Sequence, residues 1–552
     1  MLLLRPSYLK MGEQQTALPV NRSGAVDAPL DVAEVSGEQV SKFPSNLLNA
    51  LKWASSFPAM LGVFLIGRVF VAAREFVVDP DVWWHIKVGQ DILRTHHWPT
   101  TDSYSFTAFG TPWMAYEWLG DVAIGFVGKF GLRALDGLML LLGGAIATAL
   151  YYYASLCAKN SKAGFASATI VSIFAVENFN LRPQMFGFLF LVITLIVLEY
   201  FRQGRPKALW ILPPLFLIWI NAHGSWIIGV GIILVTLAGG LFNFSLGSVE
   251  ALRWTEKQRI QLELALLGSV AVIPLTPYGT QLATYPFLVA SSLPLNAENV
   301  LEWLPMPFNS LLGKLFLAVV VGAFVLQILY QFKFRLQQWV LGIGGAVMAC
   351  LHVRFVLLFA PFFSPILAIM LAPWLDRYRR EKDKFMLNAV LMAGAVFAMV
   401  WYFPTRSELE HVVETRFPVR AVSFLHSHPI EGPLFNSYDY GGYLIGSLPE
   451  HKVFIDGRGD LYELEGVMGD FLQVVNVRPA TFSVLKFYGI RTFLLQQNEP
   501  LAMVLAEHPD WKRIYKDDTS VIFVRRDSAS AFAGGGGSQK TSARIAHEPP
   551  AD

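Results

Sequence analysis

Two aspartates follow the first long apolar run of the chain. Asp79 and Asp81 flank a proline, and the pair Trp83 and Trp84 comes directly after them. Acids at the point where an apolar helix leaves a bilayer are costly to keep, which marks them as candidates for a function. A positioned carboxylate can take a proton from a reacting hydroxyl or hold a divalent ion. We therefore interpret Asp79 and Asp81 as candidate catalytic residues.

Other side chains of the same region extend this candidate site. His85 is either a second base or a histidine satisfied at the membrane interface. Two acids two residues apart can bind one hard cation if the loop curls, and Mg²⁺ and Mn²⁺ favour oxygen ligands. Glu117 is also a candidate catalytic residue, and either Glu117 or Glu298 can supply a further oxygen ligand. The predicted metal set is Asp79, Asp81 and Glu298. If no metal binds, one aspartate serves as the general base.

The composition sets the class of protein. Of the 552 residues, 54% are hydrophobic and 16% are charged, and the mean hydropathy is +0.43. This is more apolar surface than one soluble core can bury, so we expect a polytopic α-helical membrane protein. The formal net charge of +2 says nothing about partners, and no nucleic-acid partner is expected.

Apolar segments of nearly spanning length recur along the chain and predict about eleven transmembrane helices. They lie at 58–78, 136–157, 163–179, 184–200, 208–221, 225–243, 260–276, 311–332, 337–351, 354–375 and 385–403. The run 119–130 is short and contains Asp121 and Lys129, so it either spans or lies on the surface. If it lies on the surface, most basic loops share one side, which the positive-inside rule makes cytoplasmic. The N-terminus is then inside and the C-terminus outside.

This topology gathers polar residues at the outer face. Arg182 and Arg354 are outer cations that can hold phosphate oxygens with their planar guanidinium groups, although either can instead reach lipid head groups. His223 is a weaker candidate for the same phosphate. Trp83 and Trp84 suit stacking on a sugar ring, but tryptophans also belong to the interfacial belt. The loop 277–310 is predicted to be a lid, a binding loop or an anchored surface loop.

After Phe403 short apolar runs alternate with helix-like stretches, which predicts a small soluble α/β domain. The expected strands are Pro433–Asn436, Lys452–Ile455, Arg491–Leu495 and Ser520–Val524. Glycines beside acids mark candidate binding turns or ordinary turns. The predicted division is a disordered cytoplasmic tail 1–50, a membrane domain 51–404 with a large first outer loop 79–135, the α/β domain 405–526 and a tail 527–552.

The layout resembles the GT-C class of membrane glycosyltransferases, which includes protein mannosyltransferases, aminoarabinose transferases and the catalytic subunit of oligosaccharyltransferases. The stretch Asp79-Pro80-Asp81-Val82-Trp83-Trp84 looks like the acidic motif of their first outer loop, in the oligosaccharyltransferase form. The run Tyr438-Asp439-Tyr440-Gly441 is similar to an acceptor-binding signature of that branch, but its two tryptophans are absent. Tyr438, Asp439, Asp456 and Arg458 are the predicted acceptor or sugar ligands.

The resemblance implies an enzyme of the cell envelope, in a bacterial inner or plasma membrane. It would move a sugar from a polyprenyl-phosphate donor to an extracytoplasmic glycan, lipid or protein. Two other classes stay open. A secondary transporter usually has broken helices and charges at the midplane, whereas the acids here gather on one face. A sensor or scaffold with an outer ligand-binding domain would leave the acids after the first apolar run without a role.

Overall fold

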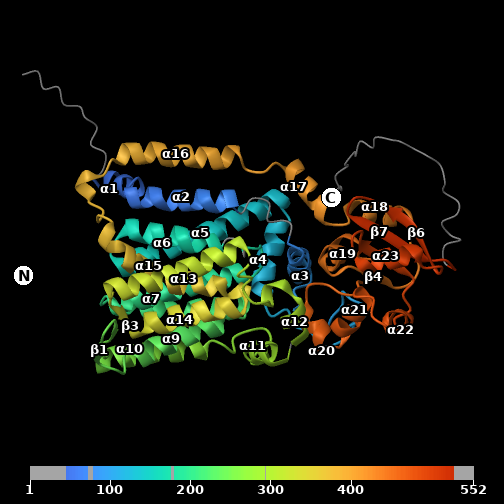
Figure 1. Cartoon of the computed structure of the whole chain (residues 1–552), viewed down its shortest axis with the longest axis horizontal. Coiled ribbons are helices and arrows are strands. Elements are labelled where there is room, and N and C mark those ends of the chain that lie inside the picture. Colours follow the sequence, from blue (N-terminus) through green and yellow to red (C-terminus); the bar gives the residue numbers. More distant parts are fainter. Residues whose placement is uncertain (1–44, 73–78, 176–178, 293, 528–552) are drawn as a thin grey trace, which may run out of the picture. The chain divides into compact units, whose positions relative to one another are not determined.

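A computed structural model describes residues 45–72, 79–175, 179–292 and 294–527 (Figure 1). The predicted tails 1–50 and 527–552 fall outside these residues, apart from 45–50 and Asp527. Residues 45–50 were expected in a disordered tail, yet they belong to helix α1 (Ser45–Ala54), in which Leu47, Leu48 and Leu51 recur at helical spacing. The end of the first expected span, 73–78, also lies outside the described residues.

Each of the eleven expected apolar segments contains a helix. These helices are α2 (Phe57–Ala72), α5 (Leu132–Ala158), α6 (Ser161–Ala175), α7 (Gln184–Arg202), α8 (Leu212–Ala222) after η3 (Pro206–Ile211), α9 (Trp226–Gly239), α10 (Glu256–Ala271), α13 (Leu311–Tyr330), α14 (Leu336–Leu351), α15 (Val356–Leu371) and α16 (Phe385–Trp401). The connections between these helices and the segment after α16 add α3 (Asp81–Thr95), α4 (Trp118–Gly128), α11 (Gln281–Ser292), α12 (Pro294–Asn299) and α17 (Arg406–Arg416). Short strands β1 (Phe244–Leu246), β2 (Val249–Ala251) and β3 (Phe334–Arg335) pair in that order at one end of the helices.

Length and hydropathy alone do not confirm eleven spans. Among the described residues, four apolar helices are long enough to cross a bilayer, or six if two bent helix pairs each count as one span. Several others are short: α9 has 14 residues, whereas an untilted crossing needs about 20. The prediction of about eleven spans therefore stays a prediction.

Helix α4 occupies the ambiguous run 119–130. Its 11 residues rise only about 16 Å, which is too short for a hydrocarbon core of about 30 Å. It packs instead on α3. Gly89 permits this contact, because a Cβ there would strike the backbone of Asp121. The two helices therefore lie close enough to bring side chains of both into one site.

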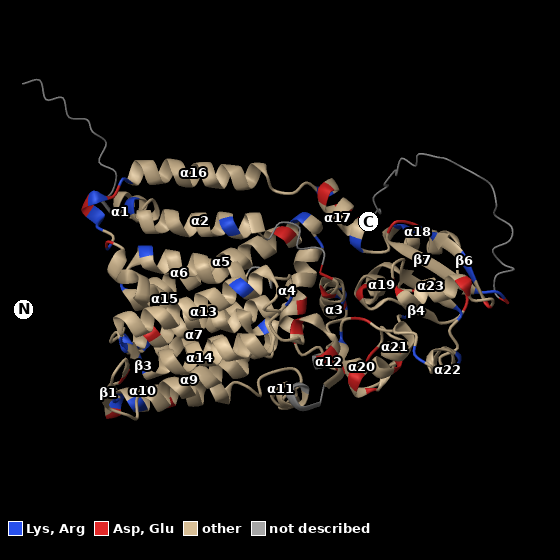
Figure 2. Ribbon diagram, in the orientation of Figure 1, with Lys and Arg blue, Asp and Glu red and all other residues tan. Residues whose placement is uncertain are grey.

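Charged residues are distributed unevenly over the helices. Figure 2 shows lysines and arginines around β1, α10 and β3 at one end of the helices. Acidic residues gather around α3, α4, α12 and α20 (Gly459–Leu464) at the other end. This separation of the signs agrees with the basic loops and acidic loops that the sequence assigns to opposite faces.

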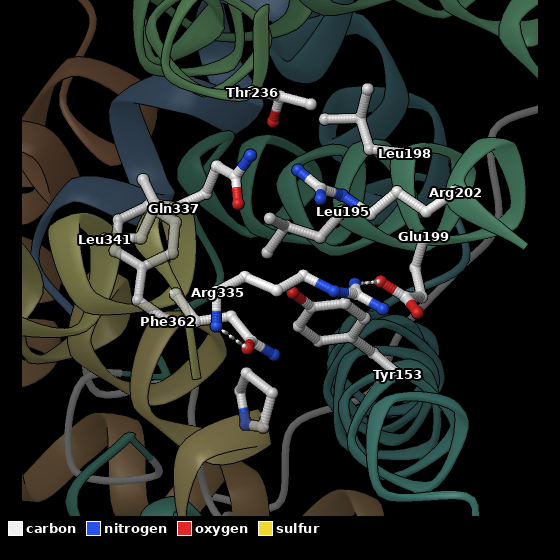
Figure 3. Close-up of a pocket in the computed structure, with 12 residues that line it drawn as sticks. Tyr153, Leu195, Leu198, Glu199, Arg202, Thr236, Arg335, Gln337, Leu341 and Phe362 are labelled. Carbon is white, nitrogen blue, oxygen red and sulfur yellow. Dashed lines mark hydrogen bonds and ion pairs between the residues drawn. The ribbon is translucent and has the colours of Figure 1, made fainter. Parts of the chain in front are cut away.

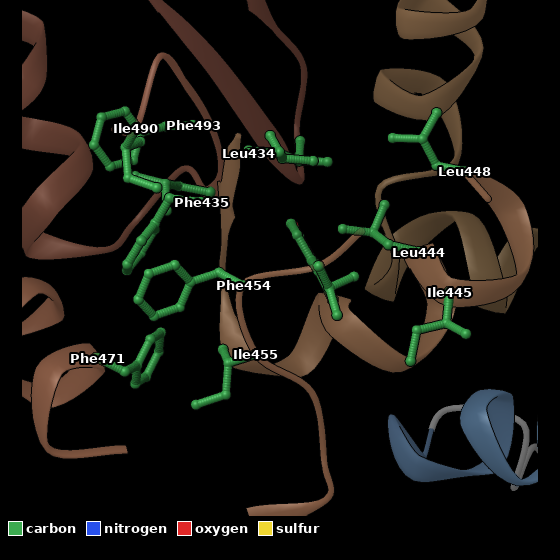
Figure 4. Close-up of a cluster of buried hydrophobic side chains, with 14 of the residues drawn as sticks. Leu434, Phe435, Leu444, Ile445, Leu448, Phe454, Ile455, Phe471, Ile490 and Phe493 are labelled. Atoms are coloured by element: carbon green, nitrogen blue, oxygen red, sulfur yellow. The ribbon is translucent and has the colours of Figure 1, made fainter. Parts of the chain in front are cut away.

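The C-terminal part is built on a four-stranded sheet in the order β4-β5-β7-β6. The strands are β4 (Leu434–Asn436), β5 (Thr492–Gln496), β6 (Trp511–Lys516) and β7 (Ser520–Arg525), and only β4 and β5 are parallel. The other elements are α18 (Val419–Ser427), η8 (Tyr438–Tyr440), α19 (Gly441–Ser447), α21 (Val467–Val475), α22 (Thr481–Phe487) and α23 (Pro500–Glu507). Figure 4 shows its apolar core, in which Phe435, Phe454 and Phe493 pack together.

The expected strand Lys452–Ile455 was wrong, and β6 was not expected. Residue Val453 forms only an isolated bridge with Ser105 of the first outer loop. The side chain of Asn436 takes the place of a strand partner, because its Oδ1 accepts from the backbone N–H of Phe454 at 2.8 Å and its Nδ2 donates to Ile455 O at 2.8 Å. A fully buried amide therefore replaces the ladder that the apolar pattern predicted.

The C-terminal part shares its core with the first outer loop. Trp84, Val88 and Ile92 of α3 belong to the same cluster of buried side chains as Leu434 and Phe493, and so do Ala108 and Trp113. Burying these side chains removes apolar surface from water on both parts at once. The predicted domain limits 405–526 stay a prediction, and residues from before 405 complete this core.

Candidate functional site

The start of α3 positions the two aspartates. Asp79 lies just before the helix, and its Oδ1 accepts a hydrogen bond from the backbone N–H of Asp81 at 2.8 Å. Asp81 lies in the first turn of α3, where the helix dipole favours a negative charge. The side chain of Asp79 thus satisfies one of the free N–H groups of the helix and fixes the distance between the two carboxylates.

Arg182 joins three carboxylates from distant parts of the chain. Its Nε lies 2.8 Å from Asp79 Oδ2, and its Nη1 lies 3.0 Å from both Asp81 Oδ2 and Glu302 Oε1. Arg182 precedes α7, and Glu302 lies in η4 (Leu301–Trp303) of the loop 277–310. The exposed fraction is 3% for the Asp79 side chain and 20% for Arg182. This partly buried cluster joins three segments that are far apart in the sequence.

Arg354 is a second cation near this cluster. Its guanidinium lies over the Trp303 ring, 4.3 Å from the centroid. Trp303 is held in place by His352, whose Nδ1 lies 2.5 Å from the Trp303 carbonyl oxygen. Within the part of the chain that the structure describes, Arg354 makes no ion pair or hydrogen bond. Its hydrogen-bond donors therefore remain available to an anionic ligand, unlike those of Arg182.

Glu117 and His223 form a partly buried pair beside these arginines. His223 Nε2 lies 3.2 Å from Glu117 Oε1. Because Nδ1 accepts from the backbone N–H of Ser225 at 3.0 Å, the ring proton lies on Nε2 and is donated to Glu117. Burial, assisted by the charge of Arg354, lowers the pKa of His223 to about 3. Burial raises the pKa of Glu117 to about 8, although Arg354 opposes the change.

Asp81 is poised to exchange a proton near neutral pH. Burial raises the pKa of its carboxyl to about 7, and the charges of Asp79 and Glu302 act in the same direction while Arg182 opposes them. The turn of Gly457 lies against this carboxyl, because a Cβ at Gly457 would overlap Asp81 Oδ1. A base whose pKa is near the working pH is suited to general base catalysis.

His85 is enclosed within the protein. Its Nδ1 lies 2.6 Å from Asp121 Oδ1 of α4, its ring stacks against Trp84, and 2% of its surface is exposed. Burial lowers the pKa of His85 well below its ordinary value. These contacts favour the second of the two interpretations, a satisfied histidine that joins α3 to α4. Asp121 was not named as a site residue, although an acid inside an apolar run was the available signal.

The predicted metal ligands do not form a metal site. Asp79 and Asp81 share the guanidinium of Arg182, which occupies the position that a cation would take between them. Glu298 is exposed in α12, and Glu302 contacts the cluster in its place. Among the described residues, no group of three or more His, Cys, Asp or Glu side chains is arranged to hold a metal ion. This set of side chains does not fit a divalent cation.

The loop 277–310 makes hydrogen bonds with the loop 79–135 and with the C-terminal part. The hydroxyl of Tyr278 donates to the Pro99 carbonyl at 3.0 Å, and the Tyr285 hydroxyl donates to Asp460 of α20. Glu463 accepts from the backbone N–H groups of Leu295 and Asn296 at 2.6 and 2.8 Å. The contacts of Asp460 and Glu463 with this loop were not predicted from the sequence, because no local pattern links these residues to it.

The predicted sugar and acceptor ligands lie in several surroundings. Trp83 packs edge-on against Phe417 and Tyr443, and Trp84 belongs to the buried core. Tyr438 is close enough to Asp81 for that charge, together with burial, to raise the pKa of Tyr438. Asp439 is exposed and accepts from Gln496 at 3.2 Å. Their roles in ligand binding stay predictions, and Trp84 and Tyr438 both lie near the Asp81 carboxyl.

Arg458 and Asp456 lie in a buried ionic cluster. Arg458 donates to Asp456 through Nε at 2.8 Å and Nη2 at 2.7 Å, and to Asp102 of the first outer loop through Nη1 at 2.5 Å. Its guanidinium also lies over the Trp113 ring, 4.7 Å from the centroid. All these donors are used within the protein, so the arrangement connects the first outer loop to the C-terminal part. A role in ligand binding stays a prediction.

No protein-family model matches the chain, and no curated protein matches it significantly. The solved structures that are similar to it include those of two membrane proteins. The oligosaccharyltransferase of Archaeoglobus fulgidus, tethered to an acceptor peptide, is 12% identical over 79% of this chain and 68% of that one, with a TM-score of 0.49. ArnT from Cupriavidus metallidurans, bound to undecaprenyl phosphate, is 14% identical over 90% of this chain and 100% of that one, with a TM-score of 0.43.

A second structure of the archaeal oligosaccharyltransferase, AglB in complex with an inhibitory peptide and a dolichol-phosphate, is 10% identical. The match covers 83% of this chain and 73% of the AglB chain, with a TM-score of 0.49. At these identities the likeness concerns the fold alone. The oligosaccharyltransferases are one of the families that the Asp79 to Trp84 motif resembles.

Proposed function

We propose that the chain is a GT-C-type membrane glycosyltransferase that moves a sugar from a polyprenyl-phosphate donor to an extracytoplasmic acceptor. One observation carries this proposal: Asp81, whose carboxyl pKa is raised to about 7 by burial, shares a cluster with Arg182, and Arg354, which has no ion pair among the described residues, lies nearby. Glycosyl transfer from a lipid phosphate needs a base for the acceptor and a cation for the departing phosphate.

The roles follow from the contacts of each side chain. The acceptor oxygen attacks the anomeric carbon, its proton passes to Asp81, and the bond from that carbon to the phosphate oxygen breaks. The electron pair leaves with the polyprenyl phosphate, whose oxygens Arg354 holds. Arg182 keeps Asp79 and Asp81 in position and favours the ionised form of Asp81. The Glu117–His223 pair borders the same cations and is neutral at pH 7.

The donor site is tested by phosphate binding. Undecaprenyl phosphate should bind the purified protein, and Arg354→Gln should weaken this binding about tenfold to a hundredfold, because a charged hydrogen bond is worth roughly 1.5–3 kcal/mol. Titration by native mass spectrometry measures the affinity. Arg94→Gln, an exposed arginine at the end of α3, is the matched control and should bind as the unaltered protein does. Equal binding by the Arg354→Gln variant, or equal binding of undecaprenol, would contradict the assigned role.

The orientation is tested by labelling single cysteines. In a variant that lacks Cys157 and Cys350, Glu465→Cys should react with an impermeant maleimide in intact cells. Lys207→Cys should react only after permeabilisation, because the basic loops are placed inside. Both positions are exposed and are therefore accessible to the reagent. Labelling of Lys207→Cys from outside would invert the topology and separate the site from an extracytoplasmic donor.

A further inference from the structure

A cavity with charged and polar side chains in its lining lies one helix length away from the carboxylate cluster. Helix α7 begins two residues after Arg182 and ends at Arg202, and its 19 residues extend about 28 Å. The ends of α5, α7 and α9, the start of α14 and part of α15 enclose a cavity of about 30 Å³. This volume has room for roughly two waters. Figure 3 shows polar side chains from α5, α7, α9 and α14 around it.

The charges around this cavity do not balance. Arg335 lies 2.7 Å from Glu199 Oε2, and Gln203 donates to the other oxygen of Glu199 at 3.1 Å. The one acid of the lining is therefore fully engaged. Arg202 lies over the Trp254 ring at 5.0 Å from its centroid, and within the described ranges it makes no ion pair or hydrogen bond. One positive charge with free donors is left at the cavity.

Gln337 provides a second and independent sign of a ligand. Its side chain is 5% exposed, and its Oε1 is buried without a hydrogen-bond partner. Figure 3 shows this amide and the Arg202 guanidinium directed toward each other from opposite sides of the cavity. A buried acceptor without a partner costs free energy, so a ligand that donates a hydrogen bond there would be stabilised. The nearby first turn of α14 adds the positive end of a helix dipole.

We propose that this cavity binds the phosphate of an anionic lipid head group that also carries a hydroxyl. Arg202 holds the phosphate oxygens, and Gln337 Oε1 accepts from the hydroxyl. Arg335 also contacts the phosphate through the exposed part of its side chain, and it stays paired with Glu199. The proposal does not depend on glycosyl transfer, because the cavity and the carboxylate cluster lie at opposite ends of α7.

The test measures lipid binding by the full-length protein in neutral detergent, using native mass spectrometry. The probes are dioleoylphosphatidylglycerol, dioleoylphosphatidylmethanol, which lacks the hydroxyls, and soluble glycerol 3-phosphate. Phosphatidylglycerol should bind at one site, and Arg202→Gln should weaken this binding tenfold or more. Gln337→Leu should reduce the preference for phosphatidylglycerol over phosphatidylmethanol to about one. Arg259→Gln, an exposed arginine on α10, is the control and should leave binding unchanged.

The outcomes separate the sources of the phosphate. If glycerol 3-phosphate competes with the lipid at similar concentration, the phosphate and hydroxyl alone are recognised, and the site takes free phosphate esters too. If it does not compete, the acyl chains contribute and the ligand is a lipid. Equal losses in the Arg202→Gln and Arg259→Gln variants would overturn the proposal, since general charge would then explain binding. An unchanged lipid preference in the Gln337→Leu variant would overturn the assignment of the hydroxyl contact.

Discussion

Replacement of Asp81 by asparagine is expected to lower the rate of glycosyl transfer by about 10²- to 10⁴-fold, because removal of a general base costs this much. Asparagine keeps the shape of the side chain but cannot take the proton of the acceptor. The rate is measured as the release of free polyprenyl phosphate by the purified protein. The donor lipids and the acceptor-containing membranes are prepared from a strain that lacks this protein. Asp510→Asn is the matched control, since Asp510 is an exposed aspartate of the C-terminal part.

The pH dependence adds a separate signature of the same residue. Burial raises the pKa of Asp81 to about 7, and only the ionised form accepts a proton. The rate constant of the unaltered protein should therefore rise from about pH 6 to pH 8 and then level off. The Asp81→Asn variant should retain the thermal stability of the parent and lose this rise. A variant that keeps both the rate and the pH profile would remove Asp81 from the mechanism.

Replacement of Arg458 by methionine is expected to destabilise the protein by about 3–5 kcal/mol, because it leaves two buried carboxylates without their cation. Asp102 and Asp456 are both buried, and Arg458 is 2% exposed. The loss should appear first in the contact between the first outer loop and the C-terminal part, where Trp113 lies against Arg458. The intrinsic fluorescence of tryptophan during thermal unfolding measures this change.

The control for that substitution is Arg420→Gln. Arg420 and Asp518 form an exposed pair at 3.8 Å, and such pairs contribute roughly 0–1 kcal/mol. Its unfolding temperature should stay close to that of the parent. If the Arg458→Met variant unfolds at the same temperature as the Arg420→Gln variant, the ionic cluster does not fasten the two parts, and a ligand-binding role for Arg458 becomes the better interpretation.

The helices and much of the site could be predicted because both depend on local sequence. Apolar runs of helical length indicated each of the eleven helices, although their lengths do not fix the number of crossings. The acids Asp79 and Asp81 were found from their place after an apolar run. Arg182 was found because few cations occur in the outer loops. The structure brings these three side chains together.

Other features depend on contacts that no local pattern encodes. Glu298 and Glu302 lie four residues apart in one loop, and only the fold of that loop decides that Glu302 meets Arg182. The segment 452–455 has the apolar character of a strand, yet the buried side chain of Asn436 satisfies its backbone instead. The turn that contains Arg458 has glycines beside acids, which is typical of a binding turn. Its structural role could not be predicted, because the partner Asp102 lies 356 residues earlier in the chain.

If Asp81 serves the transfer of a sugar from a polyprenyl-phosphate donor, its loss changes the pool of donor lipids in living cells. Lipid extracts are compared by mass spectrometry from cells that carry the unaltered chain, Asp81→Asn or Asp510→Asn as their only copy. We expect one polyprenyl-linked sugar to accumulate in the Asp81→Asn cells alone, and its mass identifies the donor. An unchanged pool of polyprenyl-linked sugars in those cells, with the protein present at normal abundance, would contradict it.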